Sequence, residues 1–298
     1  MELLEVKHYG NDMDRILKEN PFILGKEYQK SIGRTSQYNE ENIQYLLNSM
    51  NYRCDEFDQT IFNNSDLNII FTGCSYTFGF GIPSDHTWPH LMHKELMKVF
   101  PDKNIPYFNL GMVGCGLNSF VRQIMNLTNT YSHIDMIVVL APGVLRREVF
   151  SEDMKQLYKF GPNGRVSFLS SSDKLKAYDL YEKDLESEGL MFYRATMDLM
   201  ILKTICKSNN IKLMIGFAND MEPQRASRQI EYVKKEINFY KQFRDNYSEI
   251  REMFMSDETA LNVIDLASDL SHYGVMSNTD WVKRHKKIII QEATKRIR

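Results

Sequence analysis

Cysteine is scarce in this chain, and its few cysteines show no paired spacing. The 298 residues contain four of them, at Cys54, Cys74, Cys115 and Cys206. Without closely spaced pairs, the sequence predicts neither a disulfide framework nor a zinc-binding knuckle. We therefore expect four free thiols.

Long apolar runs and an excess of one charge are also missing. No apolar stretch approaches the roughly eighteen residues that a membrane-spanning helix needs, and residues 1–7 lack the charged-then-apolar pattern of a signal segment. The formal net charge is −2, with both signs interspersed, so there is no basic stripe and no polybasic anchor. We expect a cytoplasmic protein that binds neither nucleic acid nor a membrane. The sequence gives no indication of the oligomeric state.

What the sequence does contain is a set of apolar runs of strand length, separated by helical patterns. The runs lie at residues 67–72, 106–110, 136–141, 211–217 and 261–266. Several are continuously apolar, as is typical of strands buried on both faces. The alternation predicts an α/β fold: a three-layer, flavodoxin-like sheet of about five parallel strands, with helices on both faces and ligands at the carboxyl ends of the strands.

This pattern predicts one large domain over residues 61–298, preceded by an arm over residues 1–60 that wraps the core or binds a partner. An insert at residues 150–189 interrupts the domain. Two short strand patterns, 157–160 and 166–169, flank Asn163-Gly164, which supplies the positive φ angles of a tight turn, so we expect a β-hairpin there. The hairpin is either a lid or substrate wall, or a structural decoration.

A serine and a histidine that could act together in catalysis follow two of the apolar runs. Ser75 lies in a glycine-flanked turn directly after residues 67–71, and Asp269-Leu270-Ser271-His272 follows residues 261–266. Residues three apart on a turn point to one side, so Asp269 can accept from one ring nitrogen of His272 while the other nitrogen faces a serine. The three residues can therefore form a Ser-His-Asp relay that activates a hydroxyl nucleophile.

These blocks resemble the SGNH, or GDSL-like, hydrolase superfamily. Its first block is similar to residues 73–77, with Cys74 where the family has Asp, and its second block is similar to Asn109-Leu110-Gly111. The last block matches Asp269 and His272, and residues 51–57 are similar to a lead-in of several carbohydrate-active branches. The resemblance implies a serine esterase without a cofactor, in which Ser75 is the nucleophile and His272 is the general base. It also implies that the backbone amides of Ser75 and Gly111 bind the oxyanion.

The third block departs from the family pattern. The family has an asparagine after the third strand, whereas this chain has residues 138–148, with Gly143, Arg146 and Arg147 at that position. Loss of one oxyanion donor costs about two to three orders of magnitude in rate, so either the departure weakens catalysis or another donor substitutes. The candidates are Asn118, Arg146 and Arg147. Alternatively, the two arginines form ion pairs with Glu148, Glu152 or Asp153.

Three other arrangements compete with this interpretation. Cys74 beside the serine suggests a thiol nucleophile, although only one of two successive turn residues can face the histidine. His285 is the reserve partner for the serine. A group of histidines has helical spacing, but apolar residues hold the buried face of that helix, so we predict no metal site; the group comprises His86, His90 and His93.

The sequence therefore predicts an ester hydrolase that removes an O-acyl group, for example acetyl, from a small-molecule or glycan ester. Two alternatives remain open. One is an O-acyltransferase that uses the same covalent intermediate, and the other is a catalytically silent binding protein on the same fold.

Overall fold

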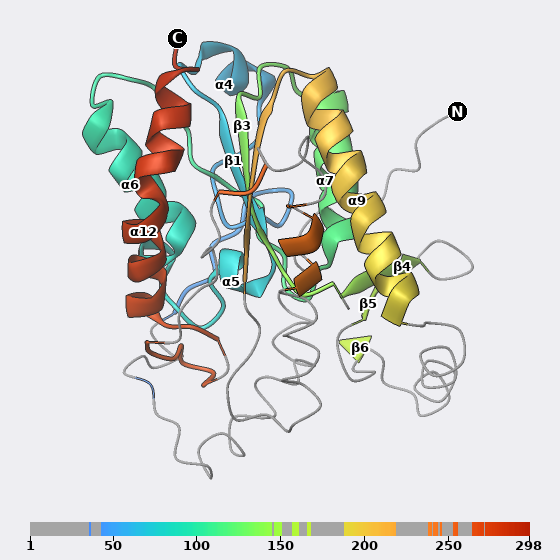
Figure 1. Cartoon of the computed structure of the whole chain (residues 1–298). Helices are drawn as coiled ribbons and strands as arrows, with labels where there is room; N and C mark the ends of the chain where they lie inside the picture. The colour runs from blue at the N-terminus through green and yellow to red at the C-terminus, as the bar shows by residue number, and fades with distance from the viewer. Residues whose placement is uncertain are drawn as a thin grey trace.

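The structure is a computed structural model of the whole chain (Figure 1). It describes residues 36, 43–144, 146–150, 157–160, 166–167, 188–218, 238–239, 241–243, 245, 253–255, 264–270 and 272–298. Everything said below of the structure refers to these residues.

A parallel sheet forms the centre of the molecule. Its strands are β1 (Ile69–Gly73), β2 (Phe108–Asn109), β3 (Met136–Ala141) and β7 (Lys212–Phe217), in the order β2-β1-β3-β7. All three pairings are parallel, and every residue of β1 and β3 is buried. Strand β2 lies on one side of β1, and β3 and then β7 lie on the other side, which is the flavodoxin-like order. The predicted α/β fold is confirmed.

The fifth position of the sheet is occupied by a segment other than the predicted one. Beside β7, the amide of Ile215 donates to the carbonyl of Met253 at 2.6 Å, and the amide of Met255 donates to the carbonyl of Ile215 at 3.1 Å. Phe254 thereby forms a parallel bridge with Ile215. The predicted strand at 261–266 is described only from residue 264, and there Leu266 bridges Tyr273 in the antiparallel sense.

Residues 264–266 do not extend the parallel sheet because this part of the segment caps a helix. The carboxylate of Asp265 accepts from the amides of Met276 and Ser277, at 3.1 and 2.9 Å, at the start of α12 (Val275–Thr294). These are first-turn amides that have no intrahelical acceptor. The apolar pattern alone could not show that Asp265 binds a helix end.

Two pairs of helices cover the two faces of the sheet, as Figure 1 shows. On one face, α12 packs against α6 (Trp88–Val99), where the Trp88 and Trp281 ring centroids lie 4.5 Å apart. On the other face, α7 (Leu117–Thr130) packs against α9 (Glu188–Ser208). Three short helices are also described: α4 (Gln59–Asn64), α5 (Ser75–Phe78) and η2 (Ser84–His86).

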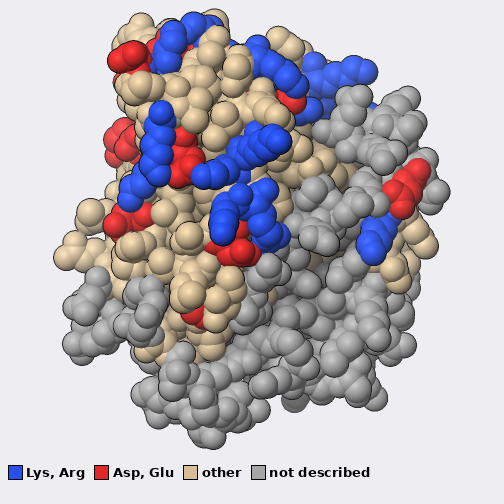
Figure 2. All heavy atoms as spheres, turned by 60° about the vertical axis from the view of Figure 1, so that its left-hand side comes forward, with Lys and Arg blue, Asp and Glu red and all other residues tan. Residues whose placement is uncertain are grey.

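The outer face of α6 and α12 carries both charges. Figure 2 shows Lys and Arg side chains beside Asp and Glu side chains on this face. Glu95 lies 2.6 Å from Lys98 and 2.7 Å from Lys286, and Asp280 lies 2.8 Å from Arg284. Such exposed pairs contribute little to stability, but they agree with the interspersed charge of the sequence. No helix in the described ranges is long and apolar enough to cross a membrane.

The insert contains the predicted hairpin, to which one further strand is added. Strands β4 (Arg147–Phe150), β5 (Leu157–Phe160) and β6 (Val166–Ser167) form an antiparallel sheet. A two-residue turn at 163–164 would place Phe160 opposite Ser167, whereas the structure places it opposite Val166. The predicted hairpin pairing of these two strands is confirmed, and its register is one residue away from that of a simple two-residue turn. Residues 161–165 themselves lie outside the described residues.

Candidate active site

Ser75 is presented by a sharp turn at the carboxyl end of β1. The strand ends at Gly73, Cys74 caps α5, and Ser75 is the first residue of that helix. A Cβ atom on Gly73 would lie 1.9 Å from Thr77 Oγ1 and 2.7 Å from the Leu140 carbonyl oxygen, so only glycine fits here. The turn directs Ser75 away from the strand while β1 stays in the centre of the sheet.

The Asp269-His272 loop lies beside this turn. Its ends are held by hydrogen bonds from the Ala267 amide to the His272 carbonyl, at 2.9 Å, and from the Ser268 amide to the Gly81 carbonyl, also at 2.9 Å. Leu270 has a φ of +59°, in the left-handed region that few non-glycine residues adopt. Strain of this kind persists only where the surroundings hold the backbone in place, and it is often found at functional sites.

The three predicted side chains form a continuous hydrogen-bonded relay. His272 Nε2 lies 2.7 Å from Ser75 Oγ, and His272 Nδ1 lies 2.6 Å from Asp269 Oδ2. The other carboxylate oxygen, Oδ1, accepts from the His272 backbone amide at 3.0 Å. Asp269 therefore fixes both the loop and the imidazole, with hydrogen on Nδ1 and a free lone pair on Nε2. Both side-chain distances lie within the range of about 2.6–3.2 Å that proton transfer requires.

The relay is enclosed by protein. Ser75 is 1 % exposed, Asp269 is 0 % exposed and His272 is 3 % exposed. The rings of Tyr76 and Phe80 lie against the imidazole, with centroid separations of 5.2 and 5.3 Å. Removal of water strengthens each hydrogen bond of the relay, because the local dielectric is lower. Sequence reasoning missed both aromatic residues, since one aromatic side chain in a glycine-rich turn carries no pattern.

The two predicted backbone donors differ in availability. Ser75 begins α5, so its amide has no acceptor within the helix. The Gly111 amide already donates to Asn109 Oδ1 at 2.9 Å, while Asn109 Nδ2 donates to the Thr77 carbonyl at 2.9 Å. A Cβ on Gly111 would lie 2.2 Å from the Phe78 amide nitrogen. In this arrangement Gly111 permits close packing against α5, and its amide is already used, which corrects the predicted oxyanion role.

Asn118 is also used for structure. Its side-chain nitrogen donates to the Glu148 carbonyl at 2.9 Å, and its side-chain oxygen accepts from the Glu148 amide at 3.1 Å. The side chain thus pairs with β4 as a neighbouring strand would. This pairing replaces the predicted role in binding the oxyanion.

The two arginines of the third block are not the partners of Glu148. That carboxylate binds Arg122 in a buried bidentate pair, with contacts of 2.9–3.1 Å. The charge of Arg147 instead reaches Asp198 in α9. Burial raises the pKa of the Asp198 carboxyl to about 6, and the positive charges of Arg147 and Arg194 oppose that rise. The predicted pairing with Glu148 is therefore wrong, because Arg122 occupies it. Glu152 and Asp153 lie outside the described residues.

The loop after β3 stays close to the second block. The Arg146 amide donates to the Gly143 carbonyl at 3.2 Å, and a Cβ on Gly116 would lie 1.9 Å from the Arg146 carbonyl oxygen. Both loops follow the carboxyl ends of strands that neighbour β1, the end at which Ser75 lies. The substrate-binding roles of Gly143, Arg146 and Arg147 stay predictions.

The competing histidines and the thiol have other places in the fold. His285 Nδ1 lies 2.7 Å from the Trp281 carbonyl, and its ring stacks on Trp281 at 4.5 Å in α12, so the reserve prediction is wrong. His93 Nε2 lies 2.7 Å from the Ile105 carbonyl, and the described part of the chain contains no group of three residues able to hold a metal. Cys74 is fully buried, while its neighbour Ser75 faces His272.

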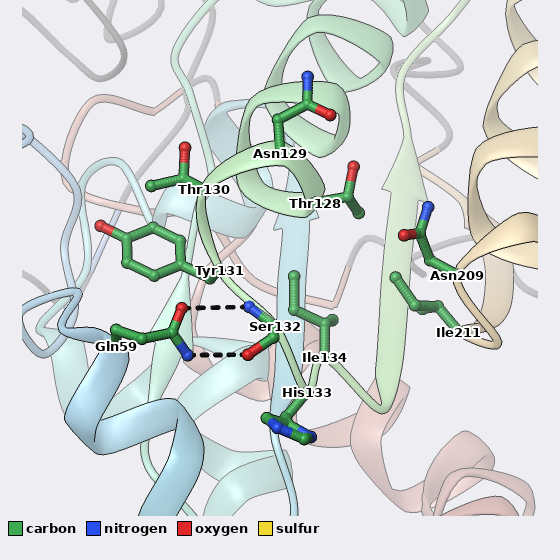
Figure 3. A pocket seen from close by; sticks show the side chains of 10 residues that line it. All are labelled: Gln59, Thr128, Asn129, Thr130, Tyr131, Ser132, His133, Ile134, Asn209 and Ile211. Atoms are coloured by element: carbon green, nitrogen blue, oxygen red, sulfur yellow. Dashed lines mark hydrogen bonds between the residues drawn. The ribbon is translucent and has the colours of Figure 1, made fainter.

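A hollow lies at the opposite end of the sheet from the relay (Figure 3). It has a volume of about 430 Å³, and its lining includes Ile134 and Ile211, just before β3 and β7. Gln59 and Ser132 both line it, and the Gln59 side chain accepts from the Ser132 amide at 3.2 Å and donates to the Ser132 hydroxyl at 3.0 Å. The described lining consists of amides, hydroxyls, one imidazole and apolar groups. It contains no nucleophile paired with a base, so the candidate active site is the relay.

Comparison with known proteins gives structural likeness alone. The chain matches no protein-family model, and no curated protein is similar to it in sequence at a significant level. Among solved structures, TesA is 10 % identical, with a TM-score of 0.45 over 75 % of this chain and 97 % of its own. The psychrotrophic esterase EstA from a Pseudoalteromonas species is 13 % identical, with a TM-score of 0.44 over 75 % of this chain and 98 % of its own.

A catalytic mutant of Axe2, an acetylxylan esterase from Geobacillus stearothermophilus, is 14 % identical. Its TM-score is 0.44 over 75 % of this chain and 95 % of its own. Because these TM-scores are below 0.5, the function proposed below rests on the chain's own residues and their geometry.

Proposed function

We propose that the chain is a serine ester hydrolase of the SGNH type, which removes a short O-acyl group from its substrate. The observation that carries the proposal is the relay from Ser75 through His272 to Asp269, with separations of 2.7 and 2.6 Å. A serine hydroxyl is a weak nucleophile unless a base removes its proton. Here the base is in contact with the hydroxyl, and a carboxylate fixes the tautomer of that base.

The geometry supports a two-step reaction through an acyl-enzyme. Ser75 Oγ attacks the acyl carbon while its proton moves to His272 Nε2, and the developing oxyanion lies toward the Ser75 amide. The ester C–O bond then breaks, and the leaving alkoxide takes the proton from Nε2. Water next attacks the acyl carbon and gives its proton to Nε2, which returns it to Ser75 Oγ as the carboxylic acid leaves. Asp269 stays ionised and stabilises the imidazolium throughout.

Acetyl on a carbohydrate is the substrate that we propose. The closely packed rings of Tyr76 and Phe80 beside His272 favour a short acyl group over a long chain. The carbohydrate part rests on the resemblance of residues 51–57 to carbohydrate-active branches of the superfamily. Within this lead-in Tyr52 and Arg53 are buried, whereas Asn51, Asp55 and Glu56 are exposed.

A chromogenic acetyl ester tests the proposal. The purified chain should release p-nitrophenol from p-nitrophenyl acetate with saturation kinetics, and Ser75→Ala should abolish the turnover. Cys74→Ser is the matched control, since it changes the adjacent buried residue and should keep most of the activity. Equal turnover by wild type and Ser75→Ala would overturn the proposal, as would a folded wild-type chain with no turnover of any acetyl ester, including acetylated oligosaccharides.

An O-acyltransferase is the second candidate, because the same Ser75-His272 pair that activates water can activate the hydroxyl of a sugar acceptor. The acyl-enzyme then passes its acyl group to that hydroxyl in place of water. Mass spectrometry of reactions with a free oligosaccharide would separate the two, because a transferase forms acetylated sugar faster than acetate.

A further inference from the structure

Arg53 is a buried cation that has no ionic partner among the described residues. The side chain is 1 % exposed, and no carboxylate in the described part of the chain lies within ion-pair distance of it. Burial lowers the pKa of its guanidinium, opposed by weaker effects of Tyr45, Tyr107 and Asp85. A buried charge without an ionic partner is costly unless hydrogen bonds replace its hydration.

Backbone carbonyls, most of them in one loop, replace the hydration of the two Nη groups, while the buried Nε has no hydrogen-bond partner among the described residues. Arg53 Nη1 donates to the carbonyls of Gly79 and Phe78, at 2.8 and 3.3 Å. Nη2 donates to the carbonyl of Ile82, and also to that of Gln44, both at 3.1 Å. Three of the four acceptors therefore belong to residues 78–82, which comprise the last residue of α5 and the loop after it. We call these residues the clamped loop.

Aromatic rings hold the guanidinium over the same loop. Its central carbon lies 4.9 Å from the Tyr45 ring centroid and 5.6 Å from that of Phe78, distances typical of cation–π contacts. The Tyr45 hydroxyl accepts from the Gly81 amide at 2.9 Å. Gly79 and Gly81 both have φ of +78°, so the loop adopts a conformation that external contacts must select.

The clamped loop contacts Ser75, His272 and the residue that precedes Asp269. The amides of Gly79 and Phe80 donate to the Ser75 carbonyl, at 2.9 and 3.1 Å. The Phe80 ring packs against His272, and the Gly81 carbonyl accepts from the Ser268 amide next to Asp269. A shift of this loop would therefore move the serine and the Asp-His loop relative to each other.

We propose that Arg53 is a positioning residue for the reaction: it fixes the clamped loop, and through that loop it sets the approach of Ser75 Oγ to His272 Nε2. This inference rests on the proposed function. Arg53 acts through the loop, since its donors are directed to backbone carbonyls. Its loss should therefore lower kcat and leave KM nearly unchanged. A misplacement of about 1 Å in such a pair costs on the order of 10²-fold in rate.

The test compares Arg53→Met, Arg53→Lys and a matched control. Methionine keeps the apolar stem without donors, and lysine keeps the charge with a single donor group. Asn68→Ala is the control: Asn68 is also fully buried and donates to two backbone carbonyls, those of Phe62 and His133 at 2.8 Å each, but it precedes β1 at the far end of the sheet. All three variants should lower the melting temperature.

The expected result is a loss of kcat confined to the arginine variants. At a temperature where circular dichroism shows every variant folded, Arg53→Met should lose about 10²-fold in kcat for p-nitrophenyl acetate, with KM within twofold. Arg53→Lys should recover part of that loss, and Asn68→Ala should keep wild-type kcat. The rate at which an organophosphate labels Ser75 should follow kcat, since it depends on the same proton transfer.

Other outcomes overturn the inference. Wild-type kcat in Arg53→Met, or an equal loss in Asn68→Ala, would show that Arg53 contributes to stability alone. If Arg53→Met does not fold, Arg53→Lys decides in the same way. Failure of the proposed function gives a different result: Ser75→Ala would then turn over ester at the wild-type rate, whatever the arginine variants do.

Discussion

The most demanding prediction concerns Asp269→Asn, because the structure specifies how the new amide must lie. In the wild type, Oδ1 accepts from the His272 backbone amide and Oδ2 faces His272 Nδ1. The asparagine oxygen must keep the backbone contact, since the reverse orientation would place an NH₂ group against an N–H donor. The side-chain nitrogen then faces Nδ1, which must become an acceptor.

That orientation inverts the tautomer of the imidazole. With Nδ1 accepting, the ring hydrogen moves to Nε2, which lies 2.7 Å from Ser75 Oγ and can no longer take the hydroxyl proton. In a related relay on another fold, the same change lowers kcat about 10⁴-fold. That factor corresponds to about 5 kcal/mol of transition-state stabilisation. Because the shape of the side chain is unchanged, KM should change little.

The assay is steady-state hydrolysis of p-nitrophenyl acetate, with melting temperatures measured in parallel. Asp280→Asn is the control, since Asp280 forms a partly exposed ion pair with Arg284 at 2.8 Å in α12 and should tolerate the same substitution with full activity. A folded Asp269→Asn variant that keeps more than a tenth of wild-type kcat would refute the reasoning, because it would show that Asp269 does not set the tautomer.

Three further predictions concern stability and the corrected residues. Gly111→Ala should destabilise the fold by about 1–3 kcal/mol in urea unfolding, since its Cβ would lie 2.2 Å from the Phe78 backbone nitrogen; unchanged stability would contradict the close packing. Asn118→Ala should lower the melting temperature through its lost pairing with Glu148 and leave kcat within threefold of wild type, so a 10²-fold loss would restore its oxyanion role. Burial raises the pKa of Asp198 from 3.8 to about 6, so the folded chain binds more protons than the unfolded chain between these values. Stability from protonated Asp198 should be present below about pH 4 and be lost as the pH rises to about 6. Asp198→Asn should therefore raise the melting temperature relative to wild type at pH 7 but not at pH 4, and a pH-independent difference would contradict the shift.

The sequence predicted the parts of the fold that depend on repeating patterns. Continuous apolar runs gave β1 and β3, since strands buried on both faces need apolar side chains at every position. The position of the fifth strand was missed, because Asp265 caps α12 through contacts eleven and twelve residues away. The hairpin was predicted from strand patterns, but its register depends on a connection that the Asn-Gly pair alone does not fix.

The relay could be predicted from the sequence for a similar reason, whereas the residues that hold it in place could not. Ser75 and the Asp269-His272 pair have local spacing with a chemical meaning, and the parallel topology brings them to one edge. The roles of Asn118 and Gly111 depend on which backbone group faces each of them, and no local pattern carries that information. Arg53 belongs to a recognised motif, but only the fold shows that its donors reach the clamped loop.

Covalent labelling of the nucleophile tests the central claim most directly. The folded wild-type chain is incubated with diethyl p-nitrophenyl phosphate, and the adduct is counted by intact mass and located by peptide mapping. We predict one adduct per chain, on Ser75, with none in Ser75→Ala and a rate reduced at least 10²-fold in His272→Ala. Labelling that stays off Ser75, or that proceeds at the wild-type rate without His272, would contradict the proposal that the relay activates this serine.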